Sequence, residues 1–272
     1  MRPVRRPRLK GLPFNRMIPN ILTLLALCSG LTSIRFGLQE QWQLAIVALV
    51  AAAIFDGLDG RVARILKGTS KFGAELDSLS DFISFGVAPA ILLYLWTMND
   101  WGRFGWLLVL IFSVCCALRL ARFNTNLDEP DSPPFAVNFF TGVPAPAAAG
   151  LVVVPMVLSF QFGDAFVREP VFVTVFLIAV SALMVSRLPT LAMKKFKVEH
   201  RWVLPLMLFI GLYAASLLSA PWATLSATAI LYIASIPYSV RLYRRLERER
   251  AQALAQAQGP SVVSDNDQTA AE

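Results

Sequence analysis

The sequence predicts an all-α, polytopic bundle of transmembrane helices with about eight spans. Of its 272 residues, 56% are hydrophobic and only 16% are charged, and the mean hydropathy is +0.57. Soluble domains usually carry about 25% charged residues, so this chain has too little polar surface for a soluble enzyme. Its charges also gather in short groups, and the uncharged runs between them approach the roughly 20 residues of a membrane-crossing helix.

The spans follow from these runs in chain order. The basic segment 1–16 resembles the start of a signal peptide, but no small-residue cleavage site follows it, so we expect an uncleaved first helix. The uncharged run between Arg201 and Arg241 is long enough for two helices, and Pro221 marks the break between them. The expected spans are about 17–37, 41–66, 79–97, 104–123, 143–161, 170–187, 202–219 and 221–240.

These spans divide the chain into three parts. Segment 1–16 is a basic N-terminal segment, residues 17–240 form the transmembrane domain, and residues 241–272 form a polar tail. The end of this tail is rich in Ala, Gln, Ser and Asp and has almost no large apolar residues. We expect it to be largely disordered, after a short helical extension of the last span.

The basic residues predict the orientation in the lipid bilayer. If the N-terminus is cytoplasmic, eight spans place all but three of the 25 Lys and Arg residues on the cytoplasmic side. The exceptions are Arg35, Arg103 and Arg168. An excess of Lys and Arg in cytoplasmic loops is the usual topology signal, so both termini are expected in the cytoplasm. The same excess of Lys and Arg accounts for the net charge of +7, so no nucleic-acid partner is needed to explain that charge.

Four aspartates are crowded around the second and third spans. Asp56 and Asp59 share one face of a helix, and Asp77 and Asp81 share a face at the start of the next. A short linker makes these helices antiparallel neighbours, so the four carboxylates converge near the cytoplasmic interface. Hard oxygen ligands of this kind suit Mg²⁺ or Mn²⁺, and two bridged ions suit substitution at phosphorus. The alternative is that the acids pair with nearby cations: Arg61, Arg64, Lys67 and Lys71.

The residues beside the aspartates fit a phosphorylated ligand. Gly60 and Ala63 leave space for a flat group to lie against the helix. Arg64 can bind a phosphate through forked hydrogen bonds. The hydroxyl group of Ser70, in the linker, can donate to another phosphate oxygen.

The pattern Asp-x-x-Asp-Gly-x-x-Ala-Arg, eight residues, Gly-x-x-x-Asp-x-x-x-Asp resembles the signature of the CDP-alcohol phosphotransferase family. All eight fixed positions are present, from Asp56 to Asp81. The resemblance implies a two-metal membrane enzyme in which Asp56, Asp59 and Asp77 are metal ligands. It implies that Asp81 is both a ligand and the general base. Gly60 and Arg64 would then bind the CDP group, and Ser70 stands where the family often has a hydroxyl for the diphosphate.

The flanking sequence resembles one branch of this family, which uses L-serine as the acceptor and CDP-diacylglycerol as the donor. The similar stretches are residues 18–23, 80–90, 117–125 and 139–150, within a resemblance that covers about residues 17–240. The resemblance implies phospholipid synthesis in a membrane, for which a bacterial plasma membrane is the expected site, and it suggests a homodimer.

Further ligand contacts are weaker predictions. Arg119 or Arg122, near the cytoplasmic end of the fourth span, could hold the serine carboxylate, with Asn124 adding a hydrogen bond. Equally, both arginines could be topology charges or structural partners, in which case 82–86 and 141–146 are the alternative acceptor region. Asn20 and Thr23, at the start of the first span, could contact cytidine, or could be an ordinary start of a helix.

Two other functions remain open at this point. A sibling enzyme could use glycerol 3-phosphate or inositol phosphate, which would need more basic residues for a second phosphate. A transporter could use the four acids as an ion pathway, but transporters place such groups near the midplane of broken helices.

Overall fold

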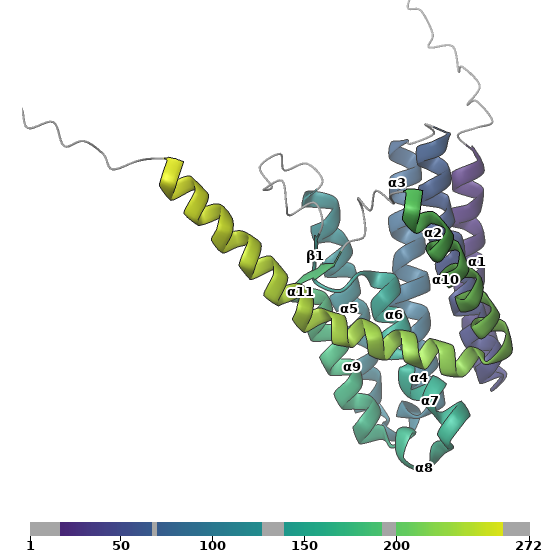
Figure 1. The fold of residues 1–272 in the computed structure, drawn as a ribbon. Helices are drawn as coiled ribbons and strands as arrows, with labels where there is room; N and C mark the ends of the chain where they lie inside the picture. Colours follow the sequence, from purple (N-terminus) through teal and green to yellow (C-terminus); the bar gives the residue numbers. More distant parts are fainter. Residues whose placement is uncertain (1–16, 67–69, 127–138, 192–199, 258–272) are drawn as a thin grey trace, which may run out of the picture.

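The structure is a computed structural model that describes residues 17–66, 70–126, 139–191 and 200–257. The basic segment 1–16 and the end of the tail, 258–272, lie outside the described residues. Figure 1 shows a bundle of long helices. In chain order the elements are α1 (Met17–Leu38), α2 (Trp42–Ile65), α3 (Lys71–Asp81), η2 (Phe82–Val87), α4 (Ala88–Trp96), η3 (Met98–Trp101), α5 (Arg103–Asn126), β1 (Phe139–Thr141), α6 (Ala145–Val152), α7 (Val154–Phe162), α8 (Asp164–Val167), α9 (Pro170–Val185), β2 (Pro189–Leu191), α10 (His200–Ser219) and α11 (Pro221–Ala257).

These helices confirm the predicted all-α membrane bundle. Among the described residues, seven helical stretches are long and apolar enough to cross a membrane. The sixth predicted span corresponds to α9, which is apolar but shorter. The third span is longer than predicted, because its helix begins at Lys71 and not near residue 79. The last helix continues to Ala257, so the first part of the predicted tail is helical.

A short pair of strands departs from the purely helical expectation. β1 and β2 are antiparallel, with Phe140 opposite Thr190, and they lie at the ends of the segments that lead into α6 and out of α9. The hydroxyl of Thr190 donates to the carbonyl of Gly142 over 2.8 Å. Gly142 has a positive φ of 77°, a conformation that glycine adopts without strain. The pair therefore fixes one end of α9 against the start of α6.

The core is formed where the helices approach most closely. Gly30 of α1 packs on Ser84, since a β-carbon at residue 30 would lie 2.5 Å from the Ser84 hydroxyl oxygen. The Ser84 hydroxyl in turn donates to the carbonyl of Ala26 over 3.3 Å. The largest fully buried side chains include Phe85, Phe112, Leu92, Met156 and Leu177.

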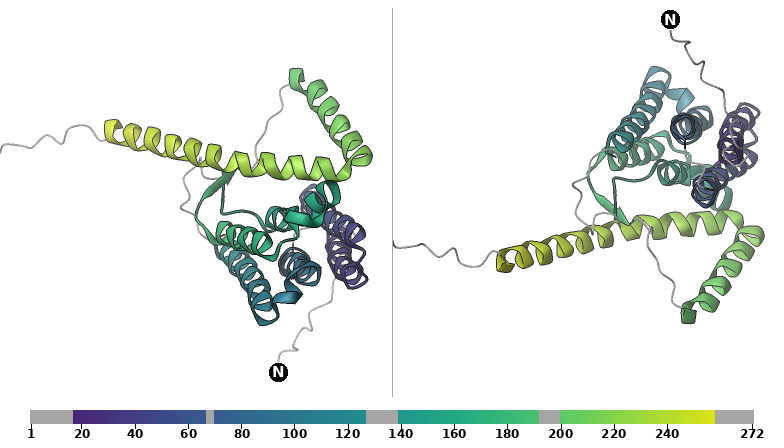
Figure 2. Two further views of the ribbon diagram at one scale, coloured as in Figure 1. Left: turned by 90° about the horizontal axis from the view of Figure 1, so that it is seen from below. Right: turned by 90° about the horizontal axis from the view of Figure 1, so that it is seen from above.

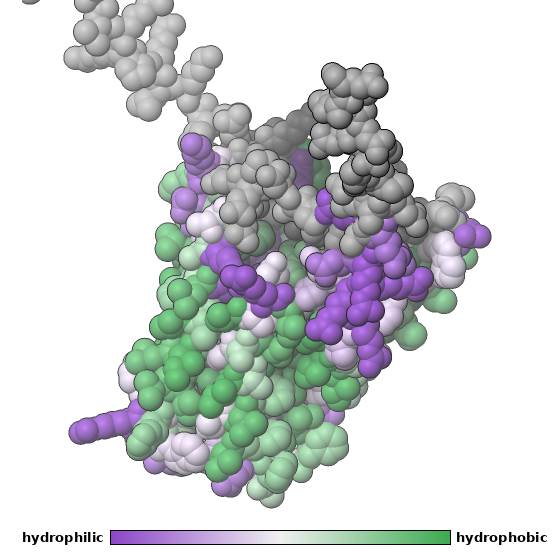
Figure 3. Space-filling view, turned by 90° about the vertical axis from the view of Figure 1, so that its left-hand side faces the viewer, coloured by the Kyte–Doolittle hydropathy of each residue, from purple (hydrophilic) through white to green (hydrophobic). Residues whose placement is uncertain are grey.

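The last two helices lie differently from the others. Figures 1 and 2 show α11 crossing one side of the bundle at a steep angle to its long helices, with α10 standing apart. α11 contacts β2 and α7, whereas none of the residues in the apolar window of α10 is buried. In Figure 3 apolar side chains cover much of the body on the face shown, and hydrophilic ones gather toward its upper end.

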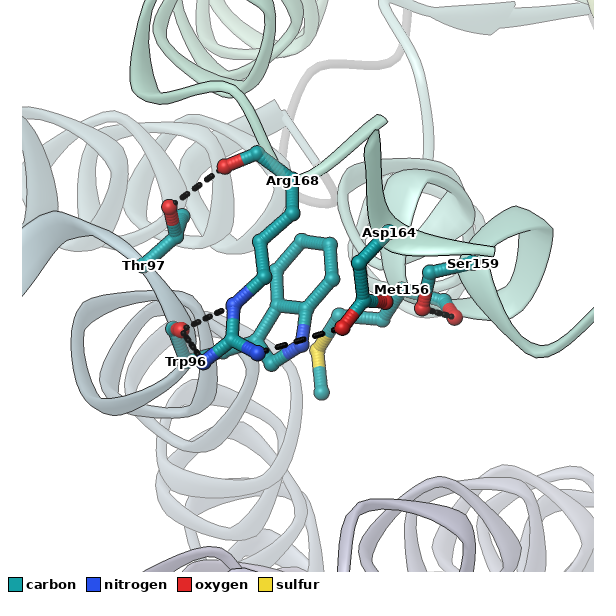
Figure 4. Close-up of polar contacts among 6 residues, drawn as sticks. All are labelled: Trp96, Thr97, Met156, Ser159, Asp164 and Arg168. Atoms are coloured by element: carbon teal, nitrogen blue, oxygen red, sulfur yellow. Dashed lines mark hydrogen bonds and ion pairs between the residues drawn. The ribbon is translucent and has the colours of Figure 1, made fainter. Parts of the chain in front are cut away.

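The opposite end of the bundle is held by Arg168, which follows α8. Its Nε and one terminal nitrogen donate to the carbonyl of Trp96 over 3.2 and 3.0 Å, and its guanidinium lies 5.7 Å from the Trp96 ring centre. The same side chain pairs with Asp164 at 3.2 Å, and Thr97 donates to the Arg168 carbonyl at 2.7 Å (Figure 4). Arg168, one of the three basic residues assigned to the outer side, thus stabilises the end of α4.

Candidate active site

Three of the four predicted metal ligands converge in space. Asp56 and Asp59 come from the last turns of α2, and Asp77 comes from α3, which packs beside α1. One carboxylate oxygen of each lies within 4.8 Å of the others. Among the described residues this is the group of acids that could hold a metal ion, and its hard oxygen donors fit Mg²⁺ or Mn²⁺.

Asp81 lies one turn beyond Asp77 on the same helix face and touches this cluster through Asp56. The carboxyl groups of Asp81 and Asp56 lie within hydrogen-bonding reach of each other. Asp81 also interacts electrostatically with Asp77 and with Arg119 of α5. The fourth aspartate therefore sits between the acidic cluster and a cation.

Helix α1 orients the cluster through Thr23. The buried Thr23 hydroxyl donates to Asp59 over 2.6 Å, and Asp59 is only 5% exposed. Ser80 of α3 donates to the Thr23 carbonyl over 3.1 Å, which ties the third aspartate's helix to the same turn. A hydrogen bond of this kind fixes which carboxylate oxygen faces the open side of the site. Thr23, predicted as a cytidine contact, thus acts on a carboxylate in this structure.

Asn20 lies one turn earlier on α1 and packs against Gly73. A β-carbon at residue 73 would lie 2.9 Å from the Asn20 side-chain oxygen. The fixed glycine of the motif therefore lies against the Asn20 side chain, where α1 and α3 approach each other. Asn20 is half-buried, and the predicted nucleotide contact stays a prediction.

The predicted phosphate-binding face of α2 is open. Among the described residues, no atom apart from the helix's own backbone lies within 4 Å of the position that a β-carbon would occupy at Gly60, and Ala63 is only half-buried. Arg64 is exposed, and its Nε donates to the Gly60 carbonyl over 2.9 Å. This bond holds the guanidinium along the same face as the aspartates and leaves its terminal nitrogens for a ligand.

Ser70 has a structural role that the sequence did not predict. It is the N-cap of α3, and its hydroxyl oxygen accepts a hydrogen bond from the Gly73 backbone N–H over 3.0 Å. The hydroxyl hydrogen is not used by this cap, so donation to a phosphate oxygen remains open.

The two candidate arginines on α5 are in different situations. The guanidinium of Arg122 donates to backbone carbonyls of β1 and of the end of α9: Thr141, Met184, Val185 and Ser186, over 2.9–3.4 Å. Helix ends leave such carbonyls without intrahelical partners, so Arg122 satisfies them. This geometry favours the structural alternative for Arg122. Asn124 donates to the Ser78 hydroxyl over 3.0 Å and joins α5 to α3.

Arg119 is buried beside Asp81 and faces the site. It is 8% exposed, and within the described part of the chain its Nε has no hydrogen-bond partner. Of the three predicted acceptor residues, it alone combines burial, proximity to Asp81 and an unused donor.

A π-helical turn, η2, sets this proximity, and it was not predicted. The Ala88 N–H bonds to the Ile83 carbonyl, five residues back. Pro89 follows and has no N–H to continue an ordinary helix, so this proline was the available signal. The Gly86 carbonyl accepts from Ser113 over 3.2 Å, and a β-carbon at residue 86 would lie 3.0 Å from the Cys116 sulfur. The close contact brings α5, and with it Arg119, against Asp81.

Comparison with known proteins agrees with this geometry. Residues 16–176 match the CDP-alcohol phosphatidyltransferase family, and residues 201–237 match a second description of it, CDP-alcohol phosphatidyltransferase 2. The chain belongs to the CDP-alcohol phosphatidyltransferase family. The first match includes α1 to α5, and so every residue predicted for the site.

Members of this phosphatidyltransferase family resemble the chain over most of its length. It is 40% identical to a CDP-diacylglycerol–serine O-phosphatidyltransferase of Mycobacterium leprae over 89% of this chain and 80% of the relative. The protein of that name from Mycobacterium tuberculosis is 39% identical over 92% and 84%. That from Helicobacter pylori is 37% identical over 80% and 88%.

Proposed function

We propose that this membrane protein transfers the phosphatidyl group from CDP-diacylglycerol to L-serine, giving phosphatidylserine and CMP. The observation that carries the proposal is the cluster of Asp56, Asp59 and Asp77 beside Asp81 and a buried arginine. The relatives named above, which act on serine, support the choice of acceptor.

The reaction follows from the positions of the side chains. Asp81 accepts the proton of the serine hydroxyl, and the serine oxygen bonds to the phosphorus that bears diacylglycerol. The bond from that phosphorus to the bridging oxygen breaks, and CMP leaves with this oxygen. Arg64 stabilises the negative charge that develops on the phosphate oxygens. The diphosphate already carries the activation, so ATP is not required.

The acidic cluster is proposed to hold two Mg²⁺ or Mn²⁺ ions. Asp56, Asp59 and Asp77 would be ligands, with Asp81 as a further ligand. Bound divalent ions would neutralise the carboxylates and stabilise charge on the phosphates. Asp56→Asn, Asp59→Asn and Asp77→Asn should each abolish turnover, and EDTA should do so in the parent protein. Full activity in EDTA would reject this part of the proposal.

An apolar cavity of about 210 Å³ has room for part of one acyl chain of the donor. It lies between α2, α6, α7 and α11, and Ala53 in its wall is one turn before Asp56. Part of an acyl chain can enter this cavity from lipid while the nucleotide stays at the open face of Gly60 and Arg64.

We also propose that the protein lies in a bacterial plasma membrane, with both termini and the active site in the cytoplasm. The distribution of Lys and Arg supports this orientation. We further propose a homodimer. The apolar surface of α10, unburied in the single chain, is compatible with such contacts.

An acceptor panel tests the function. Purified protein, CDP-diacylglycerol and divalent ions should release CMP when L-serine is added, and should not do so with glycerol 3-phosphate or inositol phosphate. Release with a phosphorylated acceptor alone would favour the sibling enzymes. Ion flux without CMP release would favour a transporter.

A further inference from the structure

We propose that Tyr232 of α11, together with Arg119, forms the subsite that binds the carboxylate of the amino-acid acceptor. This inference rests on the proposed function and adds to it a residue far from the sequence motif. It also assigns α11 a place in the acceptor site.

The first observation is a pair of buried donors that lack good partners. Within the described residues, both Nε of Arg119 and the hydroxyl of Tyr232 are inaccessible to solvent and make no well-aligned hydrogen bond. The Tyr232 hydroxyl lies near the Thr190 hydroxyl, whose own hydrogen is donated to the Gly142 carbonyl, so Thr190 can only accept from Tyr232 and cannot donate to it. Leaving a buried polar group unsatisfied costs about 1–3 kcal/mol, so two such groups in one place call for an explanation.

The second observation is that these groups come from different elements and lie near each other. Arg119 and Tyr232 lie close enough to interact electrostatically, and Arg119 interacts in the same way with Asp81. Asp81, Arg119 and Tyr232 thus lie one after another in space, on α3, α5 and α11. An amino acid that presents its hydroxyl to Asp81 would direct its carboxylate toward the other two groups.

The chemistry of the two donors selects a carboxylate. Arginine forms forked, charge-assisted hydrogen bonds to carboxylates, and a phenol adds one more donor. The neighbouring Arg122 cannot take this role while its guanidinium is bound to the four carbonyls of β1 and α9. One cation and one neutral donor suit a single carboxylate better than a dianionic phosphate, which agrees with serine as the acceptor.

α11 is the element that completes this subsite. It contacts β2, whose Thr190 lies beside Tyr232, and Tyr232 also lines the apolar cavity between α2 and α7. Tyr232 therefore borders the proposed lipid cavity, and its hydroxyl lies beside Thr190. The same residue would separate the acceptor from the acyl chains.

The test compares the variants Tyr232→Phe and Tyr238→Phe. Tyr238 lies on the same helix but is 61% exposed. Tyr232→Phe should raise the KM for L-serine about tenfold or more, because a hydrogen bond to a charged group is lost. Its kcat and its KM for CDP-diacylglycerol should stay within about twofold. Tyr238→Phe should match the parent in all three constants.

A second measurement separates ligand binding from a structural role. If the hydroxyl serves the acceptor, its removal leaves no buried group unpaired in the free protein, so the Tm of Tyr232→Phe should equal or exceed that of the parent. In the double variant Tyr232→Phe/Arg119→Lys, the increase in serine KM should be less than the product of the increases in the two single variants, since both groups bind one carboxylate.

The inference is overturned if Tyr232→Phe keeps the parent's serine KM, or if it raises both KM values equally and lowers Tm. These outcomes leave the proposed function intact as long as the parent releases CMP with serine. Failure of the parent to do so would instead reject the proposed function.

Discussion

At the scale of single residues, the site depends on what each carboxylate contacts. Asp59 is oriented by a threonine from another helix, and Asp81 is placed between Asp56 and Arg119. Four acids of the same type therefore have different environments. Their separate roles can be tested by changes that remove a single function.

Asp81→Asn should separate chemistry from binding. The amide keeps the size of the side chain but cannot accept the serine proton, so kcat should fall by about 10²–10⁴-fold, or further if a metal ligand is also lost. Binding of CDP-diacylglycerol should largely persist, because Gly60, Arg64 and three carboxylates remain. Equilibrium binding of the nucleotide lipid and single-turnover rates measure the two effects. Loss of both together would show that Asp81 is needed for donor binding.

Thr23→Val should weaken the metal site without removing a ligand. Valine has the shape of threonine but cannot donate to Asp59, and loss of such a supporting bond typically costs about 10–100-fold in metal affinity or activity. The activity should be recovered in part at higher Mn²⁺ or Mg²⁺ concentration. The matched control is Thr32→Val on the same helix, whose hydroxyl, within the part of the chain that the structure describes, bonds to the Cys28 carbonyl alone. Equal metal dependence in the two variants would contradict the assigned role of Thr23.

The sequence was most informative about residues whose partners are local. The spacing of the aspartates and of Arg64 follows from helix geometry, so their common location could be predicted. The partners of Arg122 are far away in the chain, at Thr141 and at the end of α9, and no local pattern indicates them. For the same reason the sequence could not distinguish Arg119, with its unused donor, from Arg122.

At the scale of elements, the π-helical turn η2 links the aspartates to the acceptor side. Its extra residue per turn changes the face that follows Asp81 and presents Gly86 to α5. The proline at residue 89 gives a hint of this irregularity, but periodicity alone predicts a continuous helix. The β1–β2 pair was missed because three-residue strands carry too few residues for an alternating pattern.

Gly86→Val should disturb the packing of η2 against α5, and with it the proposed acceptor site. The new side chain would meet Cys116, so α5 must move away, and overpacking of this kind costs about 1–3 kcal/mol. We expect a lower Tm and a larger loss of serine turnover than of CDP-diacylglycerol binding. Gly211→Val on α10 is the control, since no atom lies within 4 Å of its β-carbon position. If Gly86→Val has the activity and Tm of the control, the close approach of η2 and α5 does not matter for function.

At the scale of the whole molecule, hydropathy and charge gaps predicted the order of the membrane-crossing helices, although the sixth predicted span, α9, is shorter than a full span and some spans are divided into shorter helices. The arrangement of α10 and α11 could not be predicted, because both are apolar and nothing local sets their angle to the bundle (Figure 2). The charged site at one end and the Arg168 network at the other give the bundle two chemically distinct ends (Figures 1 and 4).

Labelling with a membrane-impermeant thiol reagent should reveal the orientation. In a variant without Cys28, Cys115 and Cys116, a cysteine in place of Lys71 should react only from the cytoplasmic side, because most basic residues face that side. A cysteine in place of Asn99, at the other end of the same span, should react only from outside. The reverse pattern in sealed cells would overturn the proposed topology.

The most direct test of the account follows one oxygen atom through the reaction. Purified protein would be given CDP-diacylglycerol, Mn²⁺ or Mg²⁺, and L-serine labelled with ¹⁸O in its hydroxyl group. Attack by that hydroxyl on the phosphorus bearing diacylglycerol predicts labelled phosphatidylserine, unlabelled CMP in equal amount, and no CMP when serine is omitted. Label in CMP, or CMP release that does not depend on serine, would contradict the account.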